Sequence, residues 1–268
     1  MKKILCGALL VVSSTFAMAN TPVVDPQFAK IENLIKANNF EQAYKELETL
    51  SKAGNGQATY NLGYLTQTGK GTKQDPKKAV ELYDQAGKQG YALANYILSQ
   101  GYAAGSLGLA KNPAKATEYL DKAAKQGFEE AIVEQAVILF AQGKPETDKQ
   151  ALQKLDPLIK KGSYSALYSK AIYDLSVAAK TNNRALGDKA LNSISSLAQK
   201  NFIPALLSVA NMYANGDIVA QNLPEAKKIF TALAQQNVPT AKEKLDIVNK
   251  ALADQAKNPP KAAAKAKS

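Results

Sequence analysis

The chain has 268 residues, of which 46% are hydrophobic, and this composition excludes a disordered protein and is sufficient for a large core. It contains no histidine and no tryptophan, and its single cysteine is Cys6. Ser-His-Asp and Cys-His catalytic sites, and zinc sites built from Cys and His, are therefore excluded. The formal net charge of +11 favours anionic partners, although an inert basic surface is an equal alternative.

Residues 1–19 have the features of a secretory signal peptide. Two lysines precede an apolar run over residues 4–16, and a small-x-small cleavage site follows at 17–19. We therefore expect an exported bacterial protein, periplasmic or secreted, whose mature chain begins near Asn20. Cys6 lies inside this segment with too little apolar sequence before it for an acylated residue, so the mature chain is expected to lack disulfides.

The mature chain divides by its helical patterns. Residues 20–54 predict a degenerate helix pair, with helices over 26–37 and 39–53. Residues 55–256 predict a repeat array that ends in a closing helix from about residue 239. No stretch after the signal peptide approaches ~18 consecutive apolar residues, so the protein is not expected to span a membrane.

A short pattern recurs along the array. An alanine is followed by apolar residues at +4 and +7 and by Gly or Asn, which accept a left-handed backbone, at +11. Successive alanines are 36, 37, 35, 39 and 36 residues apart, which is typical of a repeat protein. We call them the repeat alanines: Ala43, Ala79, Ala116, Ala151, Ala190 and Ala226.

Each period contains two predicted helices. In the clearest unit, Ala58 to Thr66 have helical spacing on one face, and the glycines of 69–71 end that helix. Asp75 is a natural N-cap and Pro76 suits a first turn, so a second helix is expected to run to Gly90. The small residues are expected at helix crossings, where they let two backbones approach closely.

The middle of the array is divergent. Residues 131–201 keep only the alanine and helix-end positions, with Gly143 and Asp148 before Ala151. The predicted linker at 179–188 lacks the glycine pair of the other units.

The end of the chain, 257–268, consists almost wholly of Lys, Ala and Pro and is predicted to be a disordered tail. Removing the signal peptide lowers the net charge from +11 to +9, and the tail holds four lysines, so the array carries about +5. The tail is either an idle terminus or an electrostatic tether to an anionic envelope surface. Its lysines are Lys257, Lys261, Lys265 and Lys267.

Residues 58–90 resemble the Sel-1-like repeat, a relative of the tetratricopeptide repeat. Thr66 departs from the pattern, because an aromatic residue is usual there, while residues 94–127 match well and 205–237 moderately. The matching positions of the first unit are Ala58, Leu62, Gly63, Gly69, Gly71, Asp75, Lys78, Ala79, Tyr83, Ala86 and Gly90.

This resemblance implies an all-α fold, a right-handed superhelical α-solenoid of antiparallel helix pairs with the first helices on the concave side. Members of the family generally act as protein–protein adaptors, and many bacterial ones are exported. The implied function is an exported scaffold that binds a protein or peptide partner in its concave groove, in envelope maintenance, secretion or host contact.

Tetratricopeptide-like geometry places the residues flanking the Leu-Gly pair of each first helix on the concave wall. This row is rich in Tyr, Gln and aliphatic residues and poor in charge, as interface cores are. Ordinary packing between repeats is the alternative for each residue. The predicted groove residues are Tyr60, Tyr64, Gln67, Tyr96, Gln100, Phe140, Tyr168 and Asn211, in a row that also includes Val137 and Ile172.

No catalytic, cofactor or metal site is predicted. Gly69-Lys70-Gly71-Thr72 follows a helix and lacks the spacing of a phosphate-binding loop. Paired carboxylates such as Glu129-Glu130 are expected on solvated helix faces. The main alternative function is peptidoglycan binding or an accessory role to a wall-modifying enzyme. Nucleic-acid binding is disfavoured by export and by the scattered lysines.

Overall fold

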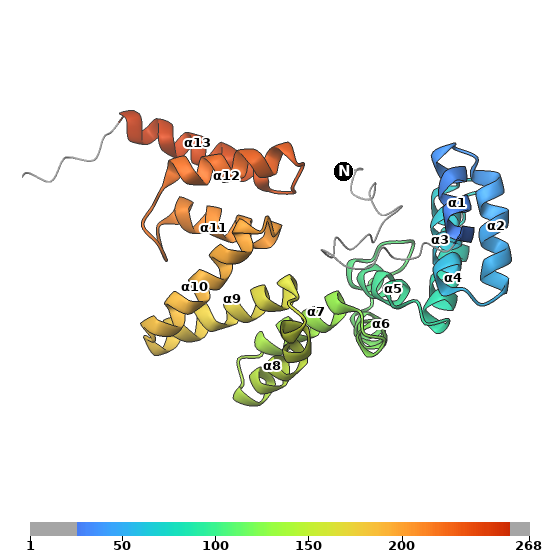
Figure 1. Cartoon of the computed structure of the whole chain (residues 1–268), viewed down its shortest axis with the longest axis horizontal. Coiled ribbons are helices and arrows are strands. Elements are labelled where there is room, and N and C mark those ends of the chain that lie inside the picture. The colour runs from blue at the N-terminus through green and yellow to red at the C-terminus, as the bar shows by residue number, and fades with distance from the viewer. Residues whose placement is uncertain (1–25, 258–268) are drawn as a thin grey trace, which may run out of the picture. The chain divides into compact units, whose positions relative to one another are not determined.

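A computed structural model describes residues 26–257 (Figure 1). Within this range the chain forms thirteen helices and no strand, so the predicted all-α class is confirmed. The helices are α1 (Pro26–Lys36), α2 (Phe40–Lys52), α3 (Gly56–Thr68), α4 (Pro76–Lys88), α5 (Ala92–Ala104), α6 (Pro113–Lys125), α7 (Glu129–Phe140), α8 (Pro145–Lys160), α9 (Tyr164–Thr181), α10 (Arg184–Gln199), α11 (Ile203–Asn215), α12 (Leu223–Gln235) and α13 (Ala241–Lys257).

The helices belong to two compact units. Residues up to Gln135 form the first unit, and residues from Ala136 onward form the second. The predicted signal peptide lies outside the described residues, as does the predicted tail from residue 258. Helix α13 ends at Lys257, one residue into that predicted tail.

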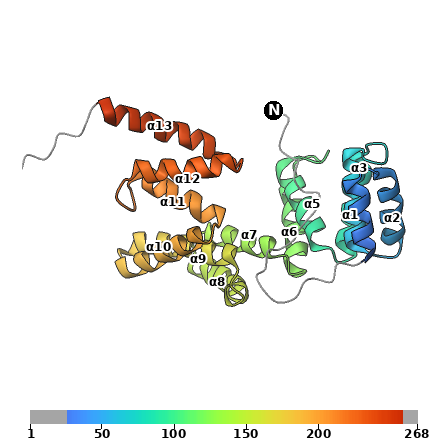
Figure 2. The same ribbon diagram turned by 45° about the horizontal axis from the view of Figure 1, so that its top comes forward.

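Most helices pack against the next helix within their unit. In the first unit α3 packs on α4 and α5 on α6, and in the second α9 packs on α10 and α12 on α13 (Figure 2). Every repeat alanine lies on an even-numbered helix, α2 to α12. The odd-numbered helices α3 to α11 are therefore the first helices of the predicted pairs.

The repeat alanines are packing positions, as predicted. All six are buried, with 8% or less of their surface exposed, and Ala43, Ala151 and Ala226 have none exposed. Each side chain at +4 is also buried, with Tyr83 at 2% and Phe230 at 0% exposed. Every residue at +11 has a positive φ: Gly54, Gly90, Gly127, Gly162, Asn201 and Asn237.

The predicted helix ends of the clearest unit are confirmed. Gly69 ends α3 with a φ of 68° and a left-handed backbone. The Asp75 carboxylate accepts a hydrogen bond from the Lys78 backbone N–H at 2.9 Å, and Pro76 is the first residue of α4. Asparagines occupy the same cap position, four residues before the repeat alanine, at α2, α6 and α12.

The linker predicted at 179–188 is wrong. Helix α9 runs to Thr181 and α10 begins at Arg184, so only two residues separate them. Asn182 adopts a left-handed conformation at φ 52° and ends α9, and the Asn183 side chain caps α10. Two asparagines therefore form this turn in place of glycines. The 39-residue spacing instead reflects longer helices, 18 residues in α9 and 16 in α10.

The crossing of α3 and α4 depends on a glycine. A Cβ at Gly63 would lie 3.0 Å from the Tyr83 ring and 3.2 Å from the Leu82 Cβ. Tyr83 therefore fills the space that the missing side chain leaves, as the repeat pattern predicts.

Two glutamines link successive repeats in the first unit. The Gln126 side chain accepts a hydrogen bond from Asn95 Nδ2 and donates one to the Gly87 carbonyl, both at 2.8 Å. At the equivalent position one repeat earlier, Gln89 accepts a hydrogen bond from the Thr59 hydroxyl at 2.5 Å and donates to the Ser51 carbonyl at 3.3 Å. Each glutamine therefore joins its own repeat to the one before it.

Replacing Gln126 with alanine is expected to lower the free energy of unfolding by about 1–2 kcal/mol, because two hydrogen bonds worth roughly 0.5–1.5 kcal/mol each are lost. Asn95 is 2% exposed and loses its partner. Urea unfolding followed by circular dichroism measures the change. Gln85→Ala, at an exposed position of α4, is the matched control. Equal effects of the two substitutions would contradict the role assigned to Gln126.

Candidate functional site

The predicted groove residues of α3 are engaged within the fold. Tyr60 is 5% exposed, and its ring lies 5.3 Å from that of Tyr83 and 5.2 Å from that of Tyr91. Burial, with smaller contributions from Tyr91 and Tyr64, raises the pKa of Tyr60 to about 12. Tyr64 is half-buried against the core of the first three helices, and Gln67 Oε1 accepts a hydrogen bond from the Tyr83 hydroxyl at 2.6 Å.

The predicted residues of α5 also make contacts between repeats. The Tyr96 ring packs on Phe128 at 5.1 Å, and burial followed by the nearby Glu134 raises the pKa of Tyr96. Gln100 Nε2 donates a hydrogen bond to the Glu134 carboxylate at 3.0 Å. In the first unit, packing between repeats therefore occupies much of the predicted row.

In the second unit the predicted residues Asn211 and Tyr168 form hydrogen bonds, and Phe140 forms a ring contact. Asn211 Nδ2 donates to the Leu207 carbonyl of its own helix at 2.8 Å. The Tyr168 hydroxyl and Ser208 Oγ are hydrogen-bonded at 2.6 Å, and the Tyr168 ring meets Phe202 edge-on. Phe140 instead stacks on Tyr173, with 4.1 Å between ring centroids. Phe140 and Tyr168 also line the same hollow.

That hollow is part of what we call the α7–α9 groove. It consists of two adjoining cavities of about 600 and 780 Å³, both within the range typical of ligand sites. Helix α7 and the turn after it supply the first lining residues, and α8 and α9 supply the rest. The groove lining includes Val137, Phe140, Asp148, Leu152, Ile172 and Tyr173.

The groove carries exposed apolar side chains. Val137 is 48% exposed and Ile172 is 39% exposed. Across the described residues, every exposed large hydrophobic side chain belongs to the second unit. The sequence row placed Val137 and Ile172 beside Phe140 and Tyr168, and the structure places all four around one hollow.

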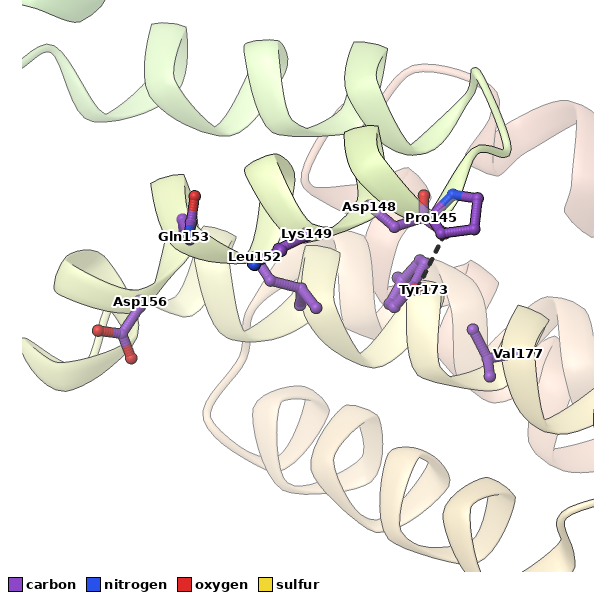
Figure 3. Close-up of a pocket in the computed structure, with 8 residues that line it drawn as sticks. All are labelled: Pro145, Asp148, Lys149, Leu152, Gln153, Asp156, Tyr173 and Val177. Carbon is purple, nitrogen blue, oxygen red and sulfur yellow. Dashed lines mark hydrogen bonds between the residues drawn. The ribbon is translucent and has the colours of Figure 1, made fainter.

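Asp148 joins the two cavities. It lines both of them, and a dashed line in Figure 3 marks its hydrogen bond with Tyr173. The Tyr173 hydroxyl donates to Asp148 Oδ2 at 3.1 Å. Partial burial, followed by this hydrogen bond, raises the pKa of Tyr173 above its ordinary value.

Sequence reasoning did not identify Asp148 and Tyr173 as site residues. Tyr173 directly follows Ile172, which belongs to the predicted row, but Tyr173 itself does not. The position of Asp148 in the groove depends on where α8 begins. A signal was present at the start of α8: the position four residues before Ala151 is Thr147, whereas α2, α4, α6 and α12 have Asn or Asp at that place.

The groove does not have the geometry of a carboxylate pair. Asp148 and Asp156 are eight residues apart on α8, which corresponds to about 12 Å along the helix. Glycoside hydrolases need their two carboxyl groups roughly 5–9.5 Å apart.

The carboxyl group of Asp84 has a lowered pKa. Burial opposes the shift, but hydrogen bonds from Lys88 and Tyr119 hold the pKa of Asp84 below its ordinary value. The Tyr119 hydroxyl donates to it at 2.7 Å, and Lys88 Nζ lies 2.6 Å away. Asp84 is therefore an ionised link between α4 and α6.

Residues 26–257 contain no group of three or more His, Cys, Asp or Glu side chains placed to hold a metal ion.

None of the helices in this described part is long and apolar enough to cross a membrane.

The stacked helix pairs, the buried alanine at each period and the positive-φ residue after it define an all-α repeat protein. The Sel1 repeat model matches residues 56–91, 92–128 and 203–238, so these three segments of the chain are similar to Sel1 repeats. The α7–α9 groove lies between the second and third matches. Sel1-repeat proteins generally mediate protein–protein interactions.

Solved structures share this fold. A Sel1 repeat protein from Oxalobacter formigenes aligns with a TM-score of 0.61 and 24% identity over 83% of this chain and 87% of its own. A protective antigen present in uropathogenic Escherichia coli strains, with an SLR fold, aligns with a TM-score of 0.57 and 24% identity over 81% of this chain. The present chain covers 46% of that antigen. No curated protein matches the sequence.

Proposed function

We propose that this protein is an exported, non-enzymatic adaptor that binds a protein or peptide partner in the α7–α9 groove. The observation that carries the proposal is the groove itself, which combines cavities of about 600 and 780 Å³ with exposed Val137 and Ile172. Apolar side chains gathered at a concave surface are typical of sites that bind another molecule.

The first unit supports a different role for its tyrosines and glutamines. Tyr60 and Gln67 are engaged by Tyr83, and Gln100 by Glu134. In the proposed division, the first unit provides a well-packed scaffold and the second unit provides the contact surface. We also propose that the protein acts in envelope maintenance, secretion or host contact, and that residues 257–268 are an electrostatic tether to an anionic envelope surface.

Site-specific crosslinking in the cells that make the protein tests the proposal. A photoreactive phenylalanine analogue at Ile172 is expected to give a discrete crosslinked species. The same analogue at Ile247 is the matched control, because Ile247 is 55% exposed on α13 and lies outside the groove. Identical products from the two positions, or none from Ile172, would overturn the groove as the contact site.

Export is tested separately. Cell fractionation followed by N-terminal sequencing is expected to find the protein outside the cytoplasm, beginning near Asn20. Protein that retains Met1 in the cytoplasm would contradict it.

A further inference from the structure

Helix α8 begins differently from four of the other helices that carry a repeat alanine, and it lacks the side-chain cap that Asn183 gives α10. In α2, α4, α6 and α12 an Asn or Asp four residues before that alanine caps the helix. Helix α8 begins earlier, at Pro145, and its N-cap residue, Lys144, makes no side-chain cap bond. Asp148 therefore lies inside the first turns of α8, where its carboxylate is not used as a cap.

The carboxylate of Asp148 is incompletely paired. Oδ2 accepts the Tyr173 hydroxyl bond, whereas Oδ1 is buried and has no hydrogen-bond partner among the described residues. An unpaired buried acceptor is costly, and a carboxylate can accept several hydrogen bonds. Asp148 as a whole is only partly buried and lines both cavities, so its carboxylate borders the groove.

The surrounding side chains leave this carboxylate available. Lys149 and Lys180 line the two cavities, but both are exposed and neither forms a salt bridge with Asp148 within the described part of the chain. Asp156, the other carboxylate of the groove, pairs with Lys160 at 2.6 Å. Among residues 26–257, therefore, no lysine or arginine forms a salt bridge with the Asp148 carboxylate.

Apolar side chains surround that acceptor. Phe140 stacks on Tyr173 beside it, with Val137 and Ile172 at the same hollow and Leu152 one turn further along α8. A group that carries a cationic donor at one point and apolar surface around it complements this arrangement. A lysine or arginine within an apolar peptide is such a group, since its stem packs on apolar surface while its head donates hydrogen bonds.

We propose that the α7–α9 groove binds a peptide segment in which one lysine or arginine donates to Asp148 and the flanking apolar side chains contact Phe140, Val137 and Ile172. This inference rests on the proposed adaptor function and gives the chemistry of the partner. Binding completes the hydrogen bonding of the Asp148 carboxylate, with the Tyr173 hydroxyl retained as its second donor.

Synthetic peptides test the inference on the full chain. The peptides are nine residues long. Their flanking positions are Leu, Ile or Phe in varied combinations, and the central residue is lysine, arginine, norleucine or glutamate. Fluorescence polarisation then measures the affinity of the best peptides. We expect lysine and arginine peptides to bind about tenfold or more tightly than their norleucine counterparts, and glutamate peptides not to bind.

Variants assign this preference to one carboxylate. Asp148→Asn is expected to remove the preference for lysine over norleucine. Asp156→Asn removes the same charge from the same helix and is expected to keep the preference. The comparison of peptides on the unmodified protein does not depend on the folding of any variant.

The outcomes separate this inference from the adaptor proposal. If lysine and norleucine peptides bind equally, or Asp148→Asn keeps the preference, the cationic contact is overturned while a groove for apolar peptides stands. If no peptide binds but Ile172 crosslinks a partner, the peptide chemistry is overturned and the adaptor function stands. If Ile172 gives no crosslink yet lysine peptides bind through Asp148, the inference is supported and the proposed cellular contact fails.

Discussion

Replacing Phe230 with alanine is expected to lower the free energy of unfolding by about 3–5 kcal/mol, the usual loss for a fully buried phenylalanine. Phe230 has 0% of its surface exposed and packs with Leu223, Leu233 and Val248 in the core of α11, α12 and α13. In a repeat protein each repeat is stabilised by its neighbours, so the substitution is expected to destabilise α11 and α13 as well as α12.

Urea unfolding monitored by far-ultraviolet circular dichroism measures this loss. Ile218→Ala is the control, because Ile218 is 50% exposed in the same unit, and a change within about 0.5 kcal/mol is expected there. Comparable midpoints for the two variants would mean that the C-terminal core does not hold the second unit together.

Gly71→Ala is expected to destabilise the first unit by about 2–4 kcal/mol, because it combines backbone strain with a steric clash. Gly71 has a φ of 73°, and a Cβ there would lie 2.2 Å from the Phe40 carbonyl oxygen. That oxygen belongs to the backbone of α2, so a side-chain rotation cannot relieve the overlap.

Gly127→Ala separates the two causes. Gly127 has a φ of 84°, but no atom lies within 4 Å of an added Cβ. It is therefore expected to lose only about 1–2 kcal/mol, the cost of a left-handed alanine. Thermal unfolding of the two variants compares the losses, and an equal decrease in Tm would show that the contact with Phe40 has no energetic consequence.

The helix boundaries of the regular repeats could be predicted from sequence because local chemistry determines them. A cap at Asp75, a proline at Pro76 and a glycine at Gly90 each act within a few residues. The same reasoning failed at 179–188, since asparagine also adopts the left-handed conformation and two asparagines made the turn shorter than expected.

The candidate site was only partly predictable. The repeat register placed Val137, Phe140 and Ile172 on one row, and they line one hollow. It gave no information on which polar partners each row residue would find. Tyr60 is buried by rings from α4 and the start of α5, and those contacts depend on packing between repeats.

Asp148 was harder to predict because its role follows from an absent cap. The repeat register places Thr147, not Asp148, at the cap position four residues before Ala151. Helix α8 begins earlier, at Pro145, so Asp148 lies within its first turns and lines the groove.

The glutamine links of the first unit have a consequence for its motions. Each joins backbone or side-chain groups of two successive repeats, so one repeat cannot open without exposing polar groups of the next. At the equivalent positions of α8 and α10 the chain has Lys161 and Lys200. We expect amide protons of α3 to α6 to exchange with solvent as one cooperative group, and those of α8 to α10 to exchange helix by helix at lower opening free energies.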